Sequence, residues 1–435
     1  MTDFEATDFF TDDAIAADPY PFYDAMRGQS PVQRESARDV MMVTGYDEAV
    51  QVLQDNGTFS SCTAVTGPFP GFPVPLAGYD DITDLIAEHR DKLPMSDQLP
   101  TFDPPMHTAH RGLLMRLITP KRLKENEAIM WKATDRLLDS FLAGGEGEFI
   151  SGFAAPFSLF VIADLLGVPE EDQQTFTEGL AHRPQSPGVG GIGEEMAHTP
   201  MEFLYEQFIA YSEDRRSSPR DDVLTGLATA TFPDGSMPEV IDAVRVASNL
   251  FSAGQETTVR LLSSALMVIA DRPDIQQLLR SEPERIPNFI EETLRIESPI
   301  KGDFRLSKVA TSVGGVDLAA GTMLMVLNGA ANRDPRHFPD PSTFDIARTN
   351  ARHHIAFGRG IHTCPGAPLA RAEARTSIER ILERTTDIRI SERVHGPADD
   401  RRFTYLPTYI LRGLTHLNLE FTLAESEATS EAGAR

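Results

Sequence analysis

Cysteine is almost missing from this chain, because only Cys62 and Cys364 occur among its 435 residues. These two thiols lie far apart in the sequence, and a disulfide framework needs more of them. A small extracellular domain held together by disulfides is therefore excluded, and a reducing compartment fits the composition. Each thiol needs its own explanation, as a structural group, a nucleophile or a metal ligand.

Long apolar runs are missing as well. No stretch reaches the roughly 18 apolar residues that a membrane-spanning helix needs. The first residues, MTDFEATDFFTDDAIAADPYPFY, are acidic and interrupted by proline. A secretory leader instead has a basic start and an apolar centre. We therefore expect a cytoplasmic chain with no membrane anchor.

Positive charge is also scarce, since 40 Lys and Arg residues face 65 Asp and Glu residues and give a net charge of −25. Nucleic acid is not expected as a partner, because its phosphates need a basic surface. The few cations are unevenly spread: residues 107–125 hold five basic residues and one acidic residue, and residues 351–375 hold four and one. We interpret these two basic segments as candidate halves of one docking face, with chance clustering as the alternative.

Helical periodicity extends over most of the chain, and two-residue alternation is confined to short runs. The pattern predicts a mainly α protein with small β-sheets. Nothing in the composition marks a linker, so we expect a single domain over residues 1–422. The expected strands lie near residue 40, within 311–327 and within 403–422.

The longest helix is predicted over Glu239–Ala270, and Pro273 ends it. At 1.5 Å per residue it is about 48 Å long, which is enough to cross the molecule. Proline and glycine interrupt residues 61–100 and 183–200, which we expect to form loops or lids. Small polar residues at 423–435 predict a disordered tail.

The sequence SAGQETT, residues 252–258, lies inside that long helix. Gly254 costs about 1 kcal/mol relative to alanine in a helix, so a close approach of another group or a local bulge is expected there. Glu256 could form an ordinary pair with Arg260 one turn later. The Thr257 hydroxyl could simply bond to the carbonyl group one turn earlier. By themselves, both polar residues have structural explanations.

A second charged motif, EETLR at residues 291–295, ends a helix before Pro299. Either Glu291 or Glu292 could pair with Arg295, since residues three or four apart share a helix face. If exposed, such a pair contributes roughly 1 kcal/mol at most.

The sequence FDPPMHTAHR, residues 102–111, is predicted to begin a helix. Asp103 is the expected N-cap, and Pro104 suits the first turn. His107 and Arg111 are four residues apart and share a face. Together they could hold an anion, although a solvated helix face is the common alternative.

The sequence HHIAFGRGIHTCPGAPLAR, residues 353–371, contains one of the two cysteines. Its glycines predict a tight loop, and APLARAEAR predicts a helix directly after it. Cys364 therefore precedes a helix N-terminus, where the helix dipole favours a thiolate over an inert thiol. A Cys/His nucleophile and a metal site both stay open, but a structural zinc site is disfavoured because it wants four ligands.

Four of these stretches, FGRGIHTCPG, SAGQETT, EETLR and ANRDPRHFPDPSTFDIAR, resemble in order and spacing the motifs of the cytochrome P450 superfamily of haem-thiolate monooxygenases. The resemblance extends from DPYPFYDAMR to LNLEF, and the cysteine loop is its most specific part. It implies a cytochrome P450 fold with the long central helix over the haem. The chain looks like a soluble bacterial member.

The resemblance also assigns roles to single residues. Cys364 matches the proximal thiolate ligand of the iron in haem b (heme, iron protoporphyrin IX), a ligand that favours O–O cleavage. Glu256 and Thr257 match the acid–alcohol pair that delivers protons on the distal side. Further positions that match haem-binding residues are His107, Arg111, Arg305 and His362, which would bind the propionates, together with Phe357, Gly358, Ala253 and Gly254.

Two features concern the support of the cysteine loop. Glu292, Arg295 and Arg348 match a buried triad that braces this loop. Pro365 departs from the family pattern, which often has leucine after the cysteine. Proline has no N–H group, so one donor to the sulfur is missing. A more electron-rich sulfur should lower the haem potential.

The resemblance implies an enzyme that inserts one oxygen atom from O₂ into an apolar small molecule, such as a terpenoid, steroid, fatty acid or aromatic compound. Two electrons would come from NAD(P)H through ferredoxin reductase and ferredoxin, and an acidic ferredoxin would suit the two basic segments. The alternatives are a peroxide-driven haem enzyme, a non-catalytic haem-binding protein and a colourless hydrolase with a cysteine nucleophile. The expected substrate walls are Val65–Ile86, Leu250–Ala253, Ile300–Phe304 and Phe403–Leu411.

Overall fold

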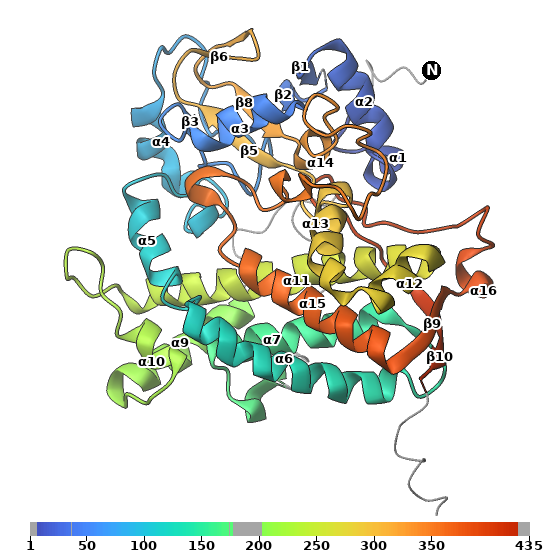
Figure 1. Ribbon diagram of the computed structural model, residues 1–435. Helices are drawn as coiled ribbons and strands as arrows, with labels where there is room; N and C mark the ends of the chain where they lie inside the picture. Colours follow the sequence, from blue (N-terminus) through green and yellow to red (C-terminus); the bar gives the residue numbers. More distant parts are fainter. Residues whose placement is uncertain (1–6, 36, 174, 177–201, 425–435) are drawn as a thin grey trace, which may run out of the picture.

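The computed structural model describes residues 7–35, 37–173, 175–176 and 202–424. Figure 1 shows most strands gathered at one end of the molecule and the long helices packed at the other. The mainly α fold with small sheets is therefore confirmed. The predicted loop at 183–200 lies outside the described residues, as does most of the predicted tail. Leu423, the first residue assigned to that tail, belongs to strand β10, so the tail boundary was placed too early.

Helices make up the larger part of the described chain. The short helical turns η1–η7 connect them, and the single-domain prediction over 1–422 stays a prediction. The helices are α1 Asp13–Ala17, α2 Tyr20–Gln29, α3 Tyr46–Gln54, α4 Thr83–His89, α5 Met106–Leu114, α6 Pro120–Phe141, α7 Ala155–Leu166, α9 Glu202–Ser217, α10 Val223–Ala228, α11 Val240–Asp271, α12 Pro273–Ser281, α13 Ile286–Ile296, α14 Asn328–Ala331, α15 Ala367–Arg384 and α16 Glu392–His395. The short turns are η1 Arg90–Lys92, η2 Leu99–Thr101, η3 Ile150–Ala154, η4 Glu170–Asp172, η5 Pro283–Arg285, η6 Ala351–His353 and η7 Gly360–His362.

In the part of the chain that the structure describes, three small sheets accompany the helices. The largest has the order β1-β2-β8-β5-β3, in which only the β2–β8 pair is parallel. The second has the order β4-β10-β9, and β6 pairs with β7. The strands are β1 Val32–Glu35, β2 Val40–Val43, β3 Phe59–Ser60, β4 Glu146–Glu148, β5 Asp303–Ser307, β6 Thr311–Val313, β7 Val316–Leu318, β8 Met323–Val326, β9 Thr385–Ile390 and β10 Asn418–Leu423. The sheets predicted near 40 and at 311–327 are confirmed, whereas 403–417 contributes only isolated bridges.

The predicted long helix is α11, and its observed bounds differ by one residue from the prediction. Glu239 and Asp242 form a reciprocal capping box at its start. The helix packs against α5, α7, α9 and α15, so it lies inside the helical half of the molecule. Gly254 allows a close approach to α7, because a Cβ atom at this position would lie 3.1 Å from Ile162 Cδ1.

No helix within the described ranges is both long and apolar enough to cross a membrane. Apolar residues of α11 instead pack in the interior, where Phe251, Leu262 and Leu266 are fully buried. Burying side chains of this size contributes roughly 1.5–3 kcal/mol each. This packing fixes the position of α11 relative to the cysteine loop, which approaches it from the other side of the cavity described next.

Candidate active site

Cys364 lies at the end of a tightly constrained loop. The loop contains η7, and the Cys364 N–H donates to the Phe357 carbonyl oxygen at 2.8 Å. Gly358 and Gly360 both have left-handed φ angles, 66° and 72°, which side chains rarely adopt. At Gly360 a Cβ atom would also lie 2.4 Å from the Leu53 carbonyl oxygen. These positions need glycine, and they fix where the thiol points.

The surroundings of the Cys364 sulfur favour and oppose its ionisation at the same time. Burial raises the pKa of the thiol, while the backbone N–H groups of Gly366 and Ala367 and the charge of Arg111 lower it. The two N–H groups belong to the start of α15, as the sequence predicts. Pro365 supplies no such donor.

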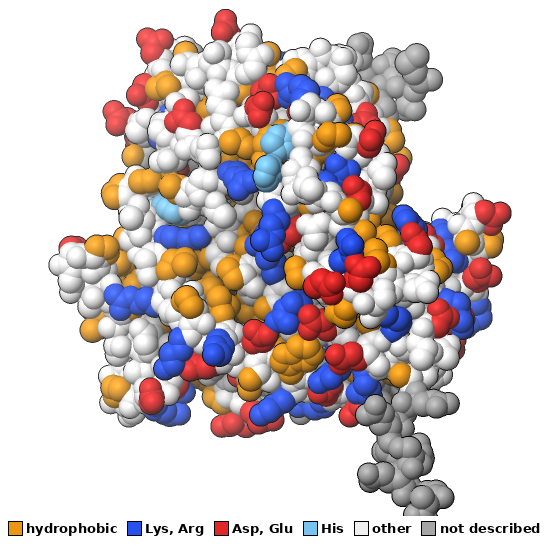
Figure 2. Space-filling model, viewed as in Figure 1, with side chains coloured by type: hydrophobic (Ala, Val, Ile, Leu, Met, Phe, Trp, Pro, Cys, Tyr) orange, Lys and Arg blue, Asp and Glu red, His pale blue; other side chains and the backbone are white. Residues whose placement is uncertain are grey.

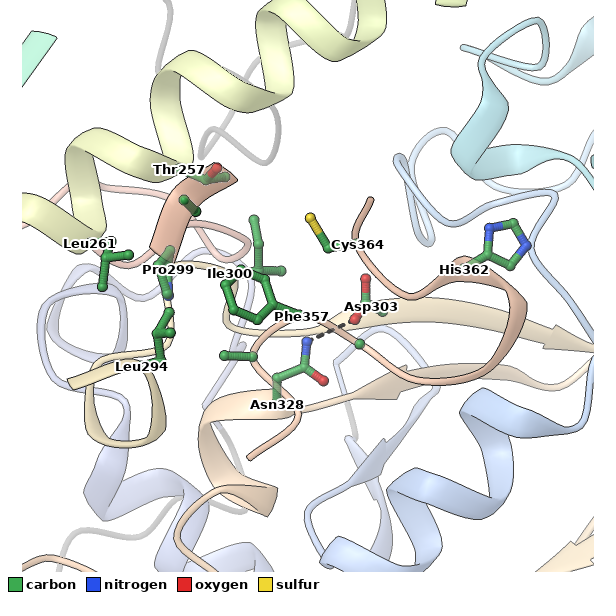
Figure 3. A pocket seen from close by; sticks show the side chains of 13 residues that line it. Thr257, Leu261, Leu294, Pro299, Ile300, Asp303, Asn328, Phe357, His362 and Cys364 are labelled. Carbon is green, nitrogen blue, oxygen red and sulfur yellow. Dashed lines mark hydrogen bonds between the residues drawn. The ribbon is translucent and has the colours of Figure 1, made fainter. Parts of the chain in front are cut away.

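The cysteine loop and α11 face each other across one cavity of about 150 Å³. Figure 3 shows the Cys364 sulfur directed into this space, with Thr257 on α11 at its other side. The Thr257 hydroxyl donates to the Ala253 carbonyl oxygen at 2.8 Å, and Glu256 pairs with Arg260 at 3.4 Å. The two structural contacts that the sequence suggests for Thr257 and Glu256 are therefore both present. The cavity is lined by Thr257, Leu261, Leu294, Pro299, Ile300, Asp303, Asn328, Ala356, Phe357, Gly358, His362, Cys364 and Ala370.

Four donor groups at the edge of this site form a cationic cluster, which consists of His107, Arg111, Arg305 and His362. The rings of His107 and His362 lie 4.2 Å apart, and the Nε2 atom of each is buried without a hydrogen-bond partner. The guanidinium groups donate to backbone carbonyls: Arg111 bonds to Thr363 at 2.6 Å, and Arg305 bonds to Phe304 at 2.6 Å. Within the described ranges, none of the four forms an ion pair.

The electrostatics of the cationic cluster show what it would bind. Burial, followed by the nearby Arg305, His107 and Arg111, lowers the pKa of His362 to about 2. Burial also lowers the pKa of both arginines and of His107. Burial disfavours the charged form of all four groups, and the neighbouring arginines add to this effect at the two histidines, so an anion would relieve it. Their number and type fit two carboxylates, because guanidinium and imidazole groups form charge-assisted hydrogen bonds with them.

The triad predicted to brace the cysteine loop is present. Arg295 donates from Nε and Nη2 to the two Glu292 oxygens at 2.7 and 2.8 Å, and Arg348 Nε reaches Glu292 at 3.0 Å. Glu292 and Arg295 are fully buried. Arg295 also donates to the Asn332 carbonyl oxygen at 2.9 Å, so the triad joins α13 to the segment before the loop.

Glu291 has a different role from the one considered in the sequence, because it does not pair with Arg295. It accepts two bonds from Arg371, at 2.7 and 2.9 Å, and lies 3.0 Å from His354 Nε2. Although burial opposes this, the bonds from His354 and Arg371 lower the pKa of Glu291 to about 2. Arg371 stacks over the Phe357 ring at 4.6 Å. A second buried carboxylate therefore supports the cysteine loop.

Two further polar residues, Glu373 and Asp303, were given no individual role from the sequence. Glu373 of α15 is buried and accepts a bond from the Thr258 hydroxyl at 3.0 Å. The sequence could have indicated this burial, because Glu373 is an acidic residue at the same four-residue spacing as the apolar Leu369 and Ile381 of an amphipathic helix. Asp303 lines the cavity, and its signal was its spacing of two from Arg305, because alternate strand residues share a face.

The expected helix cap needs correction. Asp103 does not cap α5, which begins at Met106 after Pro105. Its carboxylate instead accepts from the Ser60 hydroxyl and the Ser61 N–H, which ties this segment to β3. Of the four expected substrate walls, Ile300–Phe304 contributes Ile300 and Asp303 to the lining of this cavity, and the walls stay a prediction.

Comparison with known proteins gives consistent matches. Residues 194–387 match the family model described as Cytochrome P450. The chain is 34% identical over 432 residues to Cytochrome P450 144 of Mycobacterium tuberculosis, covering 95% of this chain and 91% of the relative. It is 31% identical to 6-deoxyerythronolide B hydroxylase of Saccharopolyspora erythraea, over 93% of this chain and 96% of that protein. The crystal structure of substrate-free CYP150A6 of Mycobacterium marinum superposes with a TM-score of 0.90 at 55% identity, covering 97% of this chain and all of that one.

Fold, site and similarity together define an oxidoreductase of the haem-thiolate class. More particularly, the chain belongs to the cytochrome P450 family, and its activity is that of a monooxygenase. Members of this family hold haem through a cysteine thiolate and use O₂ with electrons from redox partners.

Proposed function

We propose that this chain hydroxylates an apolar small molecule with O₂ and two electrons, using Cys364 as the axial thiolate of haem b. The observation that carries the proposal is that Cys364, Thr257 and His362 line one cavity, and His362 contacts His107 of the cationic cluster. A colourless hydrolase would need no cluster of buried donors suited to two carboxylates.

The residues present fit a haem group. Cys364 would ligate the iron, and His107, Arg111, Arg305 and His362 would bind the propionates. Phe357 and Gly358 line the cavity and would contact the ring. Ala253 and Gly254 on α11, which also match haem-binding positions, do not line it, and Gly254 faces Ile162 of α7. Haem supplies the iron at which O₂ is activated. The chain's contribution is to keep the sulfur anionic, through the donors at the start of α15.

Thr257 and Glu256 are proposed to move protons into the cavity. The Thr257 hydroxyl hydrogen lies on the Ala253 carbonyl oxygen, which leaves the Oγ1 lone pairs free to accept a proton. The Glu256 side chain is 38% exposed. Its contact with Arg260 is of the exposed kind that contributes under about 1 kcal/mol, so the carboxylate can exchange between Arg260 and solvent. These properties suit a relay from solvent to a hydroxyl.

The electron donor is proposed to dock where the two basic segments meet. Helices α6 and α15 pack together, which brings the segments side by side. Figure 2 views this face and shows Lys and Arg side chains near its centre, with carboxylates among them over α6 and α15. Lys121 and Arg352 are well exposed, with 86% and 70% of each side chain accessible. An acidic ferredoxin fits this surface, and salt should slow turnover by screening the attraction.

The substrate class rests on the apolar lining of the cavity and on similar proteins. One solved relative, CYP109E1 of Bacillus megaterium, is in complex with testosterone; it is 28% identical with a TM-score of 0.75, covering 93% of this chain and 99% of that one. The macrolide hydroxylase named above acts on 6-deoxyerythronolide B. A steroid, terpenoid or other apolar ring system therefore suits this chain. Its cytoplasmic location and the ferredoxin pair stay predictions.

The decisive experiment replaces Cys364 with serine. The reduced carbonyl complex of the wild type should show the red-shifted absorption typical of thiolate-ligated haem, and Cys364→Ser should lose it. Cys62→Ala is the matched control, because this second thiol is buried away from the cavity and should leave the spectrum unchanged. An unaltered spectrum in Cys364→Ser would refute the proposal. Turnover with peroxide but not with a ferredoxin pair would instead favour the peroxide-driven alternative.

A further inference from the structure

Glu291, a buried carboxylate beside the cysteine loop, binds a cation that takes no part in the proposed chemistry. Glu291 belongs to α13 and is 1% exposed, and its two oxygens accept from Nε and Nη2 of Arg371 at 2.7 and 2.9 Å. Arg371 lies on α15, the helix that follows Cys364, and 36% of its side chain is exposed. Two parallel bonds of this kind fix both the position and the plane of the guanidinium group.

The fixed guanidinium group lies against the cysteine loop. Its Cζ atom is 4.6 Å from the centre of the Phe357 ring, which is within the range of a cation–π contact. The Phe357 carbonyl oxygen accepts from the Cys364 N–H, and Figure 3 shows the Phe357 ring at the wall of the cavity into which the Cys364 sulfur points. Burial raises the pKa of the Cys364 thiol most, and the charge of Arg371 is one of the influences that lower it. The charge of Arg371 therefore acts on the sulfur.

A histidine of the cysteine loop also fixes the carboxylate. His354 is buried, and its Nδ1 accepts from the Ala356 N–H at 3.2 Å, so its Nε2 carries the proton that faces Glu291 at 3.0 Å. Burial lowers the pKa of His354, although Glu291 opposes this, so the imidazole is neutral and adds no charge. Arg352 lies 3.8 Å from Glu291, but its side chain is 70% exposed and its charge is screened by water. Arg371 therefore supplies the close cation of this carboxylate.

The two charges of this pair have opposite effects on electron uptake. Reduction of a haem bound to Cys364 adds one negative charge at the cavity. A nearby cation stabilises the reduced form and raises the haem potential, whereas a nearby anion lowers it. Water screens a buried or half-buried charge less than it screens an exposed one. Arg371 and Glu291 are therefore each expected to shift the potential, and their effects oppose each other.

We propose that Arg371 and Glu291 are positioning residues that set the haem potential as a pair: Arg371 raises it from its place against Phe357, and Glu291 holds Arg371 there and offsets its charge. This inference rests on the proposed function, because it requires haem ligated by Cys364. It adds a second control of the potential, which acts through charge, to the effect of Pro365 on hydrogen bonding to the sulfur.

The test measures the haem potential of the holoprotein by optical redox titration in the wild type, Arg371→Met, Arg371→Lys and Glu291→Gln. Arg371→Met should lower the potential and Glu291→Gln should raise it. Each shift should correspond to about a tenfold change in the one-electron equilibrium, which is about 59 mV. Arg371→Lys keeps the charge and should stay closer to the wild type than Arg371→Met. The matched control is Arg375→Met on the same helix, where the arginine pairs with Glu127 and Glu379, and its potential should equal that of the wild type.

The opposite signs separate an effect of charge from a loosening of the cysteine loop, which would admit water to the haem in both variants and move both potentials in the same direction. The double variant Arg371→Met/Glu291→Gln should return close to the wild type. Shifts of the same sign, or wild-type potentials in both single variants, would overturn the inference. If Glu291→Gln does not fold, an equal fall in Arg371→Met and Arg371→Lys would overturn it as well. None of these results affects the proposed function, which the red-shifted carbonyl absorption and the hydroxylation activity of the wild type test independently.

Discussion

Glu373 gives a specific prediction about stability, because it is a buried carboxyl group with no cation paired to it among the described residues. It lies on α15 and is 1% exposed. Burial raises its pKa to about 8, and the bond from the Thr258 hydroxyl only partly opposes this. We therefore expect Glu373 to remain protonated in the folded chain at neutral pH. It then links α15 to α11 one residue beyond Thr257.

The magnitude follows from the difference between folded and unfolded states. In the unfolded chain Glu373 ionises at its ordinary value of 4.5. Because the folded value lies higher, its stabilising contribution is complete below pH 4.5 and is lost as pH rises to about 8. In this window the free energy of unfolding should fall by about 1.4 kcal/mol per pH unit. The loss levels off above pH 8 at roughly 5 kcal/mol, as an upper bound.

The assay is urea unfolding of wild type and Glu373→Gln at several values between pH 5 and pH 8. Glutamine keeps an acceptor for Thr258 but cannot ionise. The variant should match the wild type near pH 5 and become progressively more stable relative to it toward pH 8. Trp131, the only tryptophan, reports unfolding well, because it lies on α6 with Arg380 of α15 at 5.1 Å from its ring.

The control is Glu383→Gln on the same helix, where the side chain is 57% exposed and pairs with Arg380. This substitution should leave the pH dependence as in the wild type. Comparing variants removes the contribution of every other titrating group. Parallel curves for wild type and Glu373→Gln would refute the reasoning, because they would mean that Glu373 ionises alike in both states.

Three other predictions concern the site. Thr257→Ala should keep the fold but release peroxide in place of product, and a ratio of product to O₂ equal to that of the wild type would remove Thr257 from the mechanism. Pro365→Leu restores an N–H group beside the sulfur and should raise the haem potential; a potential that stays constant or falls contradicts the role given to proline. Glu292→Gln should destabilise the chain by roughly 3–5 kcal/mol, because it leaves the buried Arg295 without its carboxylate; a loss below about 1 kcal/mol in urea unfolding would argue against a bracing triad.

Much of the architecture could be predicted because its signals are local. The bounds of α11 follow from continuous helical periodicity and from Pro273 at its end. The tight turn before Cys364 follows from glycines that adopt left-handed φ angles. The pairing of Glu292 with Arg295 follows from their spacing alone. Their burial makes the pair important, and it could not be predicted from the spacing.

The errors concern residues whose role depends on a partner far along the chain. Asp103 has the sequence context of a helix cap, yet its carboxylate accepts hydrogen bonds from Ser60 and Ser61. Glu291 has an arginine four residues away, yet it binds Arg371, which lies 80 positions later. In both cases a tertiary partner outcompetes the local one, because a carboxylate is stabilised most where several donors converge.

The cationic cluster connects the fold most closely with the chemistry. Its members come from α5, β5 and the cysteine loop, so only the complete fold brings them together. Elsewhere in the site the buried ions are paired, as Glu292 and Glu291 are with their arginines. Among the described residues of the cluster, two buried imidazole nitrogens have no hydrogen-bond partner, and burial and the neighbouring arginines lower the pKa of His362. Such a cluster costs free energy unless an anion meets it. A ligand with two carboxylates that binds only the folded chain then stabilises it by mass action. The residues that destabilise the fold when no such ligand is bound would therefore also orient the bound ligand relative to Cys364.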